Sequence, residues 1–340
     1  MLAKIFESLY LKVLVNIVRK RATTVVYIEL HSKKGAIDSV HSEFDSTTLN
    51  DKMVDFISNY TKESPYYYIS ILDYSVLQGA LPTCDKHKFA YYYDLSDCEY
   101  KCYKNSWVYY TSKPELYDIE KDYKEVGVDF IFSPFVILAD FFKDKIVGKL
   151  ALYALVQEGY VSIAVFEKDR LLYAEHLDMQ ANTEVEDILL TNDLNEDIDI
   201  DLDDGGIDLE SIDVDDDTEI EDFGNIEDLD TIEDIDEFDD SKDVEEELLE
   251  SADILEEAEE GSFNEDYQRF SLIQSSIARY YRDDRYESQF LENMYISDGV
   301  GVSSDLKKYL EEEMFLNVYI RHIELDAEVC ELTKGELGIS

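Results

Sequence analysis

An acidic stretch in the second half of the chain constrains the fold more than any other feature. Residues 184–260 hold 38 aspartates and glutamates against one basic residue, Lys242, a net charge of −37. Self-repulsion at this charge density opposes a compact state, and the isolated aliphatic residues between the acids bury too little surface to offset the chain entropy. We predict that residues 183–261 form an acidic, low-complexity insert that divides the globular part of the chain. Residues 183 to about 242 are expected to be disordered, whereas the spacing of Leu248, Leu249, Ile254 and Leu255 leaves a fluctuating helix open over 243–260.

Outside the acidic stretch the composition is that of an ordinary soluble domain. The 340-residue chain has a net charge of −50, which leaves −13 for the residues outside 184–260. A surface of this sign repels phosphates, so nucleic acids are not expected as partners. No run of eighteen apolar residues and no signal peptide are visible in the sequence. The four cysteines suggest no disulfide framework, which favours a reducing cytoplasm.

The first 21 residues are basic and have apolar residues at spacings of three and four, from Leu2 to Ile17. This spacing is typical of an amphipathic helix, so we predict a basic amphipathic helix over residues 1–21. Three settings stay open for it. The helix could dock on its own domain, lie on a membrane surface, or bind a partner protein.

Beyond residue 22, β-branched and apolar runs alternate with amphipathic stretches, which predicts an α/β fold. Strands are predicted over residues 23–30, 36–44, 66–73, 106–112, 128–134, 293–297 and 316–325. Helices are predicted over residues 48–60, 115–124, 135–142 and 266–283, and from Ser303. The clearest pattern is a β-meander over 149–179, whose three strands are joined by polar turns.

Two stretches resemble one family. VGVDFIFSPFVILADFF (126–142) and MYISDGVGVSSDLKKYLEEEMFLNVYI (294–320) are similar to segments of the actin-like ATPase fold as used by the pilus assembly protein PilM and the cytoplasmic domain of the secretion protein GspL. The resemblance implies a two-lobed, actin-like (ribonuclease H-like) fold with mixed sheets. It places the first lobe at 22–147 and the second at 148–182 and 262–330, on either side of the acidic insert 183–261.

The resemblance also implies a nucleotide held by three loops between the lobes. It places five residues in these loops: Glu29, Gly159, Asp298, Gly299 and Gly301. Bulky Leu30 stands where a glycine would let backbone amides approach a phosphate, and Glu158 would repel one. Only the turn at 298–301 keeps its pattern, and the fold needs a tight turn there with or without a ligand. We therefore expect vestigial loops without a cofactor, and ATP with magnesium remains the alternative.

One further group of residues is a candidate metal site. Cys84, His87, Cys98 and Cys102 would supply four zinc ligands from one loop-rich region. Their spacing is not that of paired CxxC motifs, so reduced thiols without a metal are the competing interpretation. No nucleophile elbow, Walker A or zinc-protease motif is present, and we therefore see no conventional hydrolase or transferase.

The resemblance implies a non-catalytic scaffold, cytoplasmic and peripheral to the inner membrane. Such a protein binds the cytoplasmic tail of a PilN-like single-pass membrane protein in a groove of its first lobe. The machine would be a type IV pilus, a type II secretion system or a flagellar motor accessory. Two alternatives stay open: an active actin-like ATPase that drives assembly, and an acidic adaptor whose insert binds a basic protein.

Overall fold

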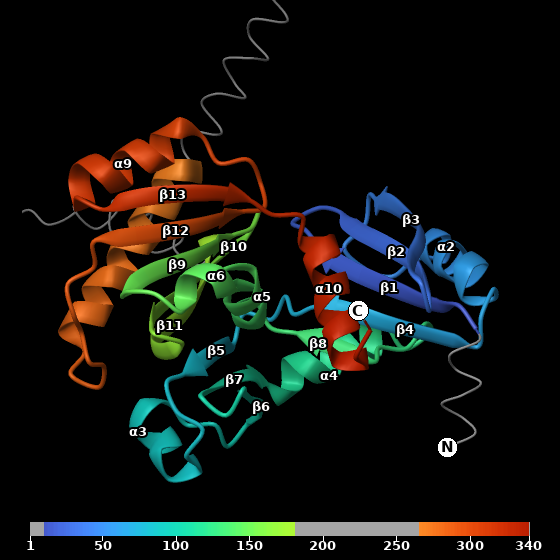
Figure 1. The fold of residues 1–340 in the computed structure, drawn as a ribbon, viewed down its shortest axis with the longest axis horizontal. Helices are drawn as coiled ribbons and strands as arrows, with labels where there is room; N and C mark the ends of the chain where they lie inside the picture. The colour runs from blue at the N-terminus through green and yellow to red at the C-terminus, as the bar shows by residue number, and fades with distance from the viewer. Residues whose placement is uncertain (1–9, 181–264, 340) are drawn as a thin grey trace, which may run out of the picture. The chain divides into compact units, whose positions relative to one another are not determined.

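The computed structural model describes residues 10–180 and 265–339 (Figure 1). The predicted acidic insert over 183–261 and the first nine residues of the predicted N-terminal helix lie outside these residues. Among the described residues, no helix combines the length and the apolar character needed to cross a bilayer.

The first of two five-stranded sheets has the order β3-β2-β1-β4-β8. Its strands are β1 (Lys12–Arg19), β2 (Thr24–Ser32), β3 (Gly35–Phe44), β4 (Tyr66–Leu72) and β8 (Phe130–Phe132). The first three strands form an antiparallel meander, whereas β4 pairs in parallel with β1 and β8 in parallel with β4. Helix α2 (Asp51–Thr61) supplies the crossover from the meander to β4.

The prediction of a helix over residues 1–21 is wrong for the described part, because Lys12–Arg19 is the central strand β1. Its six inner residues, 13–18, are all buried, since neighbouring strands flank both edges and side chains cover both faces. A strand buried on both faces is apolar almost throughout, and a continuous apolar run contains helical spacings by coincidence. The first lobe therefore includes Lys12, ten residues before the predicted limit.

The second sheet repeats the plan of the first, with the order β11-β10-β9-β12-β13. Its strands are β9 (Ala151–Val156), β10 (Tyr160–Glu167), β11 (Arg170–Asp178), β12 (Asn293–Asp298) and β13 (Asn317–His322). Again an antiparallel meander is followed by two strands parallel to its first member. A helix over residues 265–282 precedes β12, and α9 (Ser304–Met314) lies between β12 and β13. Two sheets of this order make the actin-like, two-lobed fold, and the predicted fold class is confirmed.

A small antiparallel sheet is inserted into the first lobe between β4 and β8. It has the order β5-β7-β6, with β5 (Gln78–Leu81), β6 (Cys98–Tyr103) and β7 (Trp107–Ser112). A turn of 3-10 helix, η1 (Lys86–Lys88), and the short α3 (Phe89–Tyr92) connect β5 to β6. One buried cluster of this unit consists of Leu81, Phe89, Leu95, Cys98 and Val108. Ala80 and Trp107 of the same sheet are buried in the larger core that includes α5 and the second sheet. Helices α4 (Lys113–Asp122), α5 (Pro134–Phe141) and α6 (Lys143–Ile146) complete the route to the second sheet.

The C-terminal helix α10 (Leu325–Leu337) was not predicted and returns to the first sheet. Figure 1 shows it lying against β1 and β4. The buried hydroxyl of Thr333 lies 2.6 Å from Ser70 Oγ and donates to Asn16 Oδ1 at 3.3 Å. The predicted limit of the second lobe at residue 330 therefore falls inside a helix that packs on the first lobe.

Candidate functional site

A cavity of about 280 Å³ lies where the β1–β2 hairpin meets the β9–β10 hairpin. The first lobe contributes the basic run Arg19–Arg21, and the second contributes Glu158, Gly159 and Gly299. The start of α10 completes the lining with Glu324, Leu325 and Asp326. In an actin-like fold this cleft between two meanders is the position that the resemblance assigns to a nucleotide.

The five predicted loop residues do not come together at this cavity. Gly159 and Gly299 line it, and the carboxylate of Asp298 accepts hydrogen bonds from the amides of Val300, Gly301 and Val302 at 2.7–3.1 Å. Gly301 has φ +82°, so the turn needs glycine there for its backbone conformation.

Glu29 is not among the residues that line the cavity, and placing it in a phosphate loop was wrong. Its carboxylate lies on β2 beneath α10, 2.9 Å from Lys334 Nζ. The error follows from reading β1 as a helix, because that reading made the β2–β3 hairpin the first loop. The hairpin at the cavity is 20–23, and its basic residues are the signal that sequence reasoning attributed to a membrane or partner helix.

Backbone amides at the cavity already have acceptors within the protein. The amide of Arg21 donates to Glu158 Oε2 at 3.1 Å, so a carboxylate of the second lobe occupies the place of an anion at the first hairpin. The amides of Lys20, Gln157 and Gly299 donate to backbone carbonyls of their own turns or of β9, at 2.8–3.0 Å. A phosphate would have to displace these acceptors to be held by the same donors.

The basic side chains at the cavity are also engaged. Lys20 Nζ lies 3.0 Å from Glu43, and Arg21 lies 3.6 Å from Glu265. The Arg19 guanidinium stacks over the Tyr74 ring, 4.4 Å from its centroid. All three interactions involve side chains that are partly exposed to solvent. Interactions of this kind contribute little free energy to folding, and their main effect is to orient the three cations.

A partly buried histidine, His176, stacks on Tyr160 of the cavity lining. The His176 ring stacks on Tyr160 at 5.1 Å between centroids, and its Nδ1 lies 2.8 Å from Ser162 Oγ. Burial lowers the pKa of His176 to about 4. The imidazole is therefore neutral near pH 7 and supplies no positive charge for a phosphate.

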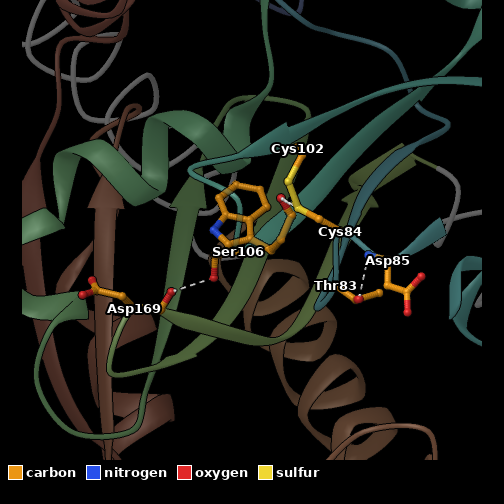
Figure 2. Close-up of a disulfide and its surroundings, with 7 residues drawn as sticks. Thr83, Cys84, Asp85, Cys102, Ser106 and Asp169 are labelled. Atoms are coloured by element: carbon orange, nitrogen blue, oxygen red, sulfur yellow. Dashed lines mark hydrogen bonds between the residues drawn. A yellow bond between two sulfur atoms is a disulfide. The ribbon is translucent and has the colours of Figure 1, made fainter. Parts of the chain in front are cut away.

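The four candidate zinc ligands do not form a metal site. Cys84 and Cys102 are joined by a disulfide, with their Cα atoms 5.8 Å apart (Figure 2). Cys98 is a buried free thiol, and no cluster of potential metal ligands occurs within residues 10–180 and 265–339. The expectation that the chain has no disulfide was also wrong. The small sheet brings two cysteines 18 residues apart into contact, and sequence spacing alone does not reveal this pairing.

A second, larger hollow of about 830 Å³ lies in the first lobe, between α10, α5 and the β6–β7 hairpin. Its apolar lining comes from Tyr103, Tyr109, Phe132, Val136, Phe141 and Leu332. Lys101 on β6 and Glu336 on α10 form an ion pair of 3.0 Å between two of the walls. We call this hollow the first-lobe groove. Sequence reasoning missed its residues because it did not predict α10.

Gly335 on α10 lines the first-lobe groove and faces open space, because no atom lies within 4 Å of the place where its Cβ would be. Glycine inside a helix costs about 0.5–1 kcal/mol relative to alanine. Nothing in the fold requires glycine here, since Gly335 lacks the positive φ of the C-cap Gly338. The position is therefore suited to the close approach of a ligand.

Gly299 is required by packing, and we expect Gly299→Ala to lower the free energy of unfolding by about 1–3 kcal/mol. A Cβ at this position would lie 3.0 Å from the carbonyl oxygen of Val156 and 3.2 Å from Leu325 Cδ1. Gly159→Ala is the matched control at the same cavity, because no atom lies within 4 Å of its Cβ position. Urea unfolding of both variants checks this, and equal stabilities would contradict it.

Two family models cover most of the described residues. A model of a domain of unknown function, DUF8341, matches residues 152–338, and a model of another domain of unknown function, DUF8569, matches residues 10–139. No curated protein matches the chain.

Several solved structures are similar to the chain at low sequence identity. A Bacteroides thetaiotaomicron protein with an actin-like ATPase fold and unknown function is 12% identical with a TM-score of 0.43, over 93% of this chain and 94% of that one. A PilM–PilN type IV pilus biogenesis complex gives 9% identity and a TM-score of 0.44, over 90% and 87%. The ethanolamine utilization protein EutJ from Carboxydothermus hydrogenoformans gives 8% and 0.36, over 90% and 83%.

Proposed function

The chain belongs to the family of the domain of unknown function DUF8341, and we propose that it is a non-catalytic scaffold whose first-lobe groove binds a segment of another protein. The observation that carries this proposal is the groove itself, about 830 Å³ in volume, which is lined by aromatic and aliphatic side chains, by charged side chains and by an open glycine. Pockets of this size and character are typical ligand sites in proteins.

The partner that we propose is the cytoplasmic tail of a PilN-like single-pass membrane protein. This choice rests on the resemblance of residues 126–142 and 294–320 to PilM-like proteins. On the same resemblance we propose a location at the cytoplasmic face of the inner membrane, within a type IV pilus, a type II secretion system or a flagellar motor accessory. Binding through a partner's tail needs no membrane helix at the N-terminus, where residues 12–19 form β1.

The proposal of a non-catalytic protein is supported by the state of the interlobe cavity. The Glu158 carboxylate accepts a hydrogen bond from the Arg21 amide. The side chain of Lys20 pairs with Glu43, and that of Arg21 pairs with Glu265. A triphosphate would have to break these contacts and then lie beside the Glu158 carboxylate, which repels it. An actin-like fold whose cleft amides and cations are already paired within the protein is suited to binding other proteins instead of a nucleotide.

Magnesium ATP at millimolar concentration is expected to leave the melting temperature of the protein unchanged. A site with a dissociation constant one hundredth of the ligand concentration would stabilise the fold by about 2.7 kcal/mol, which a thermal shift detects readily. Glu158→Gly, which frees the Arg21 amide and removes the repelling carboxylate, is the matched comparison. A saturable rise in the unmodified protein would overturn the proposal and favour an active actin-like ATPase.

A further inference from the structure

The disulfide between Cys84 and Cys102 lies at the edge of the first-lobe groove. Cys102 is exposed and lines the groove, whereas Cys84 is half-buried in the loop after β5. Figure 2 shows the bond reaching from this loop to the strand that carries Cys102. An exposed disulfide is open to attack by small thiols and by redox proteins.

The disulfide fastens a weakly held part of the fold. Strand β6 is an edge strand that pairs only with β7. In the segment 82–97, which connects β5 to β6 through η1 and α3, only Phe89 and Leu95 are buried, and both belong to the small cluster of this sheet. Segments with so few buried contacts open at low free energy unless something else holds them. A crosslink that closes an 18-residue separation restricts the open states of this segment.

The same hairpin forms one wall of the first-lobe groove. Lys101, Cys102, Tyr103 and Lys104, at the end of β6 and in the turn that follows, all line it. At the tip of the hairpin, Ser106 Oγ donates to the carbonyl of Asp169 in the β10–β11 turn at 3.4 Å, as Figure 2 shows. The position of this wall therefore depends on the bond at Cys102.

We propose that Cys84–Cys102 is a site of reversible thiol–disulfide exchange, and that this exchange determines whether the β6 wall of the groove is held in place or released. The bonded form holds β6 and the preceding loop in the groove geometry described above, and the reduced form releases them. The consequence for a bound tail rests on the proposed function, whereas the exchange itself does not. In the cytoplasmic location proposed above, disulfides are rare and are usually transient or redox-sensing.

The exchange partner is a dithiol reductant. One of its thiolates attacks Cys102 Sγ, the S–S bond breaks, and Cys84 leaves as a thiolate that takes up a proton. The second thiol of the reductant loses its proton and attacks the mixed disulfide, and Cys102 is released and protonated. Two electrons pass from the reductant, which becomes a disulfide, to the protein, which gains two thiols.

The other cysteines are poorly suited to this chemistry. Cys98 and Cys330 are free and buried. Burial raises the pKa of the Cys98 thiol, and it raises the pKa of Cys330 to about 12. A buried thiol that stays protonated is a weak nucleophile, so neither residue competes for the exposed bond.

Trp107, the only tryptophan of the chain, provides an internal reporter. Its carbonyl oxygen lies 3.3 Å from Cys84 Sγ, and its ring lies 4.7 Å from that of the groove residue Tyr103. Because a nearby disulfide quenches indole fluorescence, breaking the bond is expected to raise Trp107 emission. The full-length protein, folded and in buffer without denaturant, is treated with dithiothreitol and then with oxidised glutathione.

The expected result has three parts. Emission rises on reduction and falls on reoxidation, while alkylation with mass spectrometry finds Cys84 and Cys102 newly reactive. Hydrogen exchange over residues 82–104 rises about tenfold or more, as for local opening, while the second sheet stays protected. In the Cys84→Ser/Cys102→Ser double variant, dithiothreitol changes neither the Trp107 emission nor the hydrogen exchange. In Cys98→Ala, both change as in the unmodified protein.

Two results would overturn the inference. The first is a disulfide that dithiothreitol reduces only after urea has unfolded the chain, which would make the bond a structural crosslink. The second is reduction without a change in hydrogen exchange over residues 82–104. None of these measurements uses a partner protein, so their failure is distinct from failure of the proposed tail binding.

Discussion

Replacing Lys334 by methionine is expected to lower the free energy of unfolding by about 3–5 kcal/mol, because the change leaves the Glu29 carboxylate buried without its main partner. Glu29 is only 5% exposed, and its Oε2 lies 2.9 Å from Lys334 Nζ. Its other oxygen contacts His31 Nδ1 at 3.2 Å. The ion pair joins β2 to α10, so its loss weakens the contact between the C-terminal helix and the first sheet.

The pKa values of the pair indicate that both groups are charged in the folded protein. Burial alone would raise the pKa of Glu29, but hydrogen bonds from Lys334 and His31 outweigh burial and hold it below its usual value. Burial alone would lower the pKa of Lys334, yet its bonds to Glu331 and Glu29 raise it. Removing the ammonium therefore exposes the full cost of burying the carboxylate.

Urea unfolding of Lys334→Met measures this cost. The double variant Glu29→Gln/Lys334→Met has no unpaired charge at this position and should recover much of the lost stability. Lys307→Met is the matched control, because Lys307 lies 3.7 Å from Glu311 on α9 with both side chains more than 40% exposed. Exposed pairs contribute about 0–1 kcal/mol. Equal effects of the two lysine substitutions would refute the assigned role of Lys334.

Much of the fold was accessible from local patterns in the sequence. The three strands predicted over 149–179, joined by polar turns, are found as β9, β10 and β11. The glycine turn between β12 and α9 was also placed correctly, and Ser303 caps α9 by accepting from the Asp305 amide. These elements are specified by residues close together in sequence, so one pass along the chain finds them.

The errors concern features that depend on distant residues. β1 is apolar because sheet neighbours and helices surround it, and its sequence alone does not distinguish a buried strand from a buried helix. That one error displaced the first loop and drew attention to Glu29 instead of Arg21. The disulfide depends on the small sheet, and the position of α10 depends on the first sheet. Both sheets form only when segments far apart in the chain meet.

Gly335→Tyr is expected to weaken binding of a PilN-like tail to the first-lobe groove by about 30-fold or more, since an anchor displaced from the centre of an interface costs about 2–4 kcal/mol. Apart from the helix's own backbone, no atom lies within 4 Å of the Cβ position of Gly335, so the first side-chain carbon of a tyrosine meets no neighbour at this wall of the groove. The added ring would take the volume that the tail needs, which acts as a steric block.

Gly335→Ala is the matched control for this block. Alanine adds one methyl group in open space and favours the helix by about 0.5–1 kcal/mol, so this variant should fold at least as well as the unmodified protein and still bind the tail. Calorimetry with a synthetic tail peptide compares the two variants, and unfolding curves establish that both are folded. If Gly335→Tyr is folded and binds the tail as tightly as Gly335→Ala, the groove between α10, α5 and the β6–β7 hairpin is not the binding site, and the interlobe cavity becomes the next surface to test, with a substitution at Gly159.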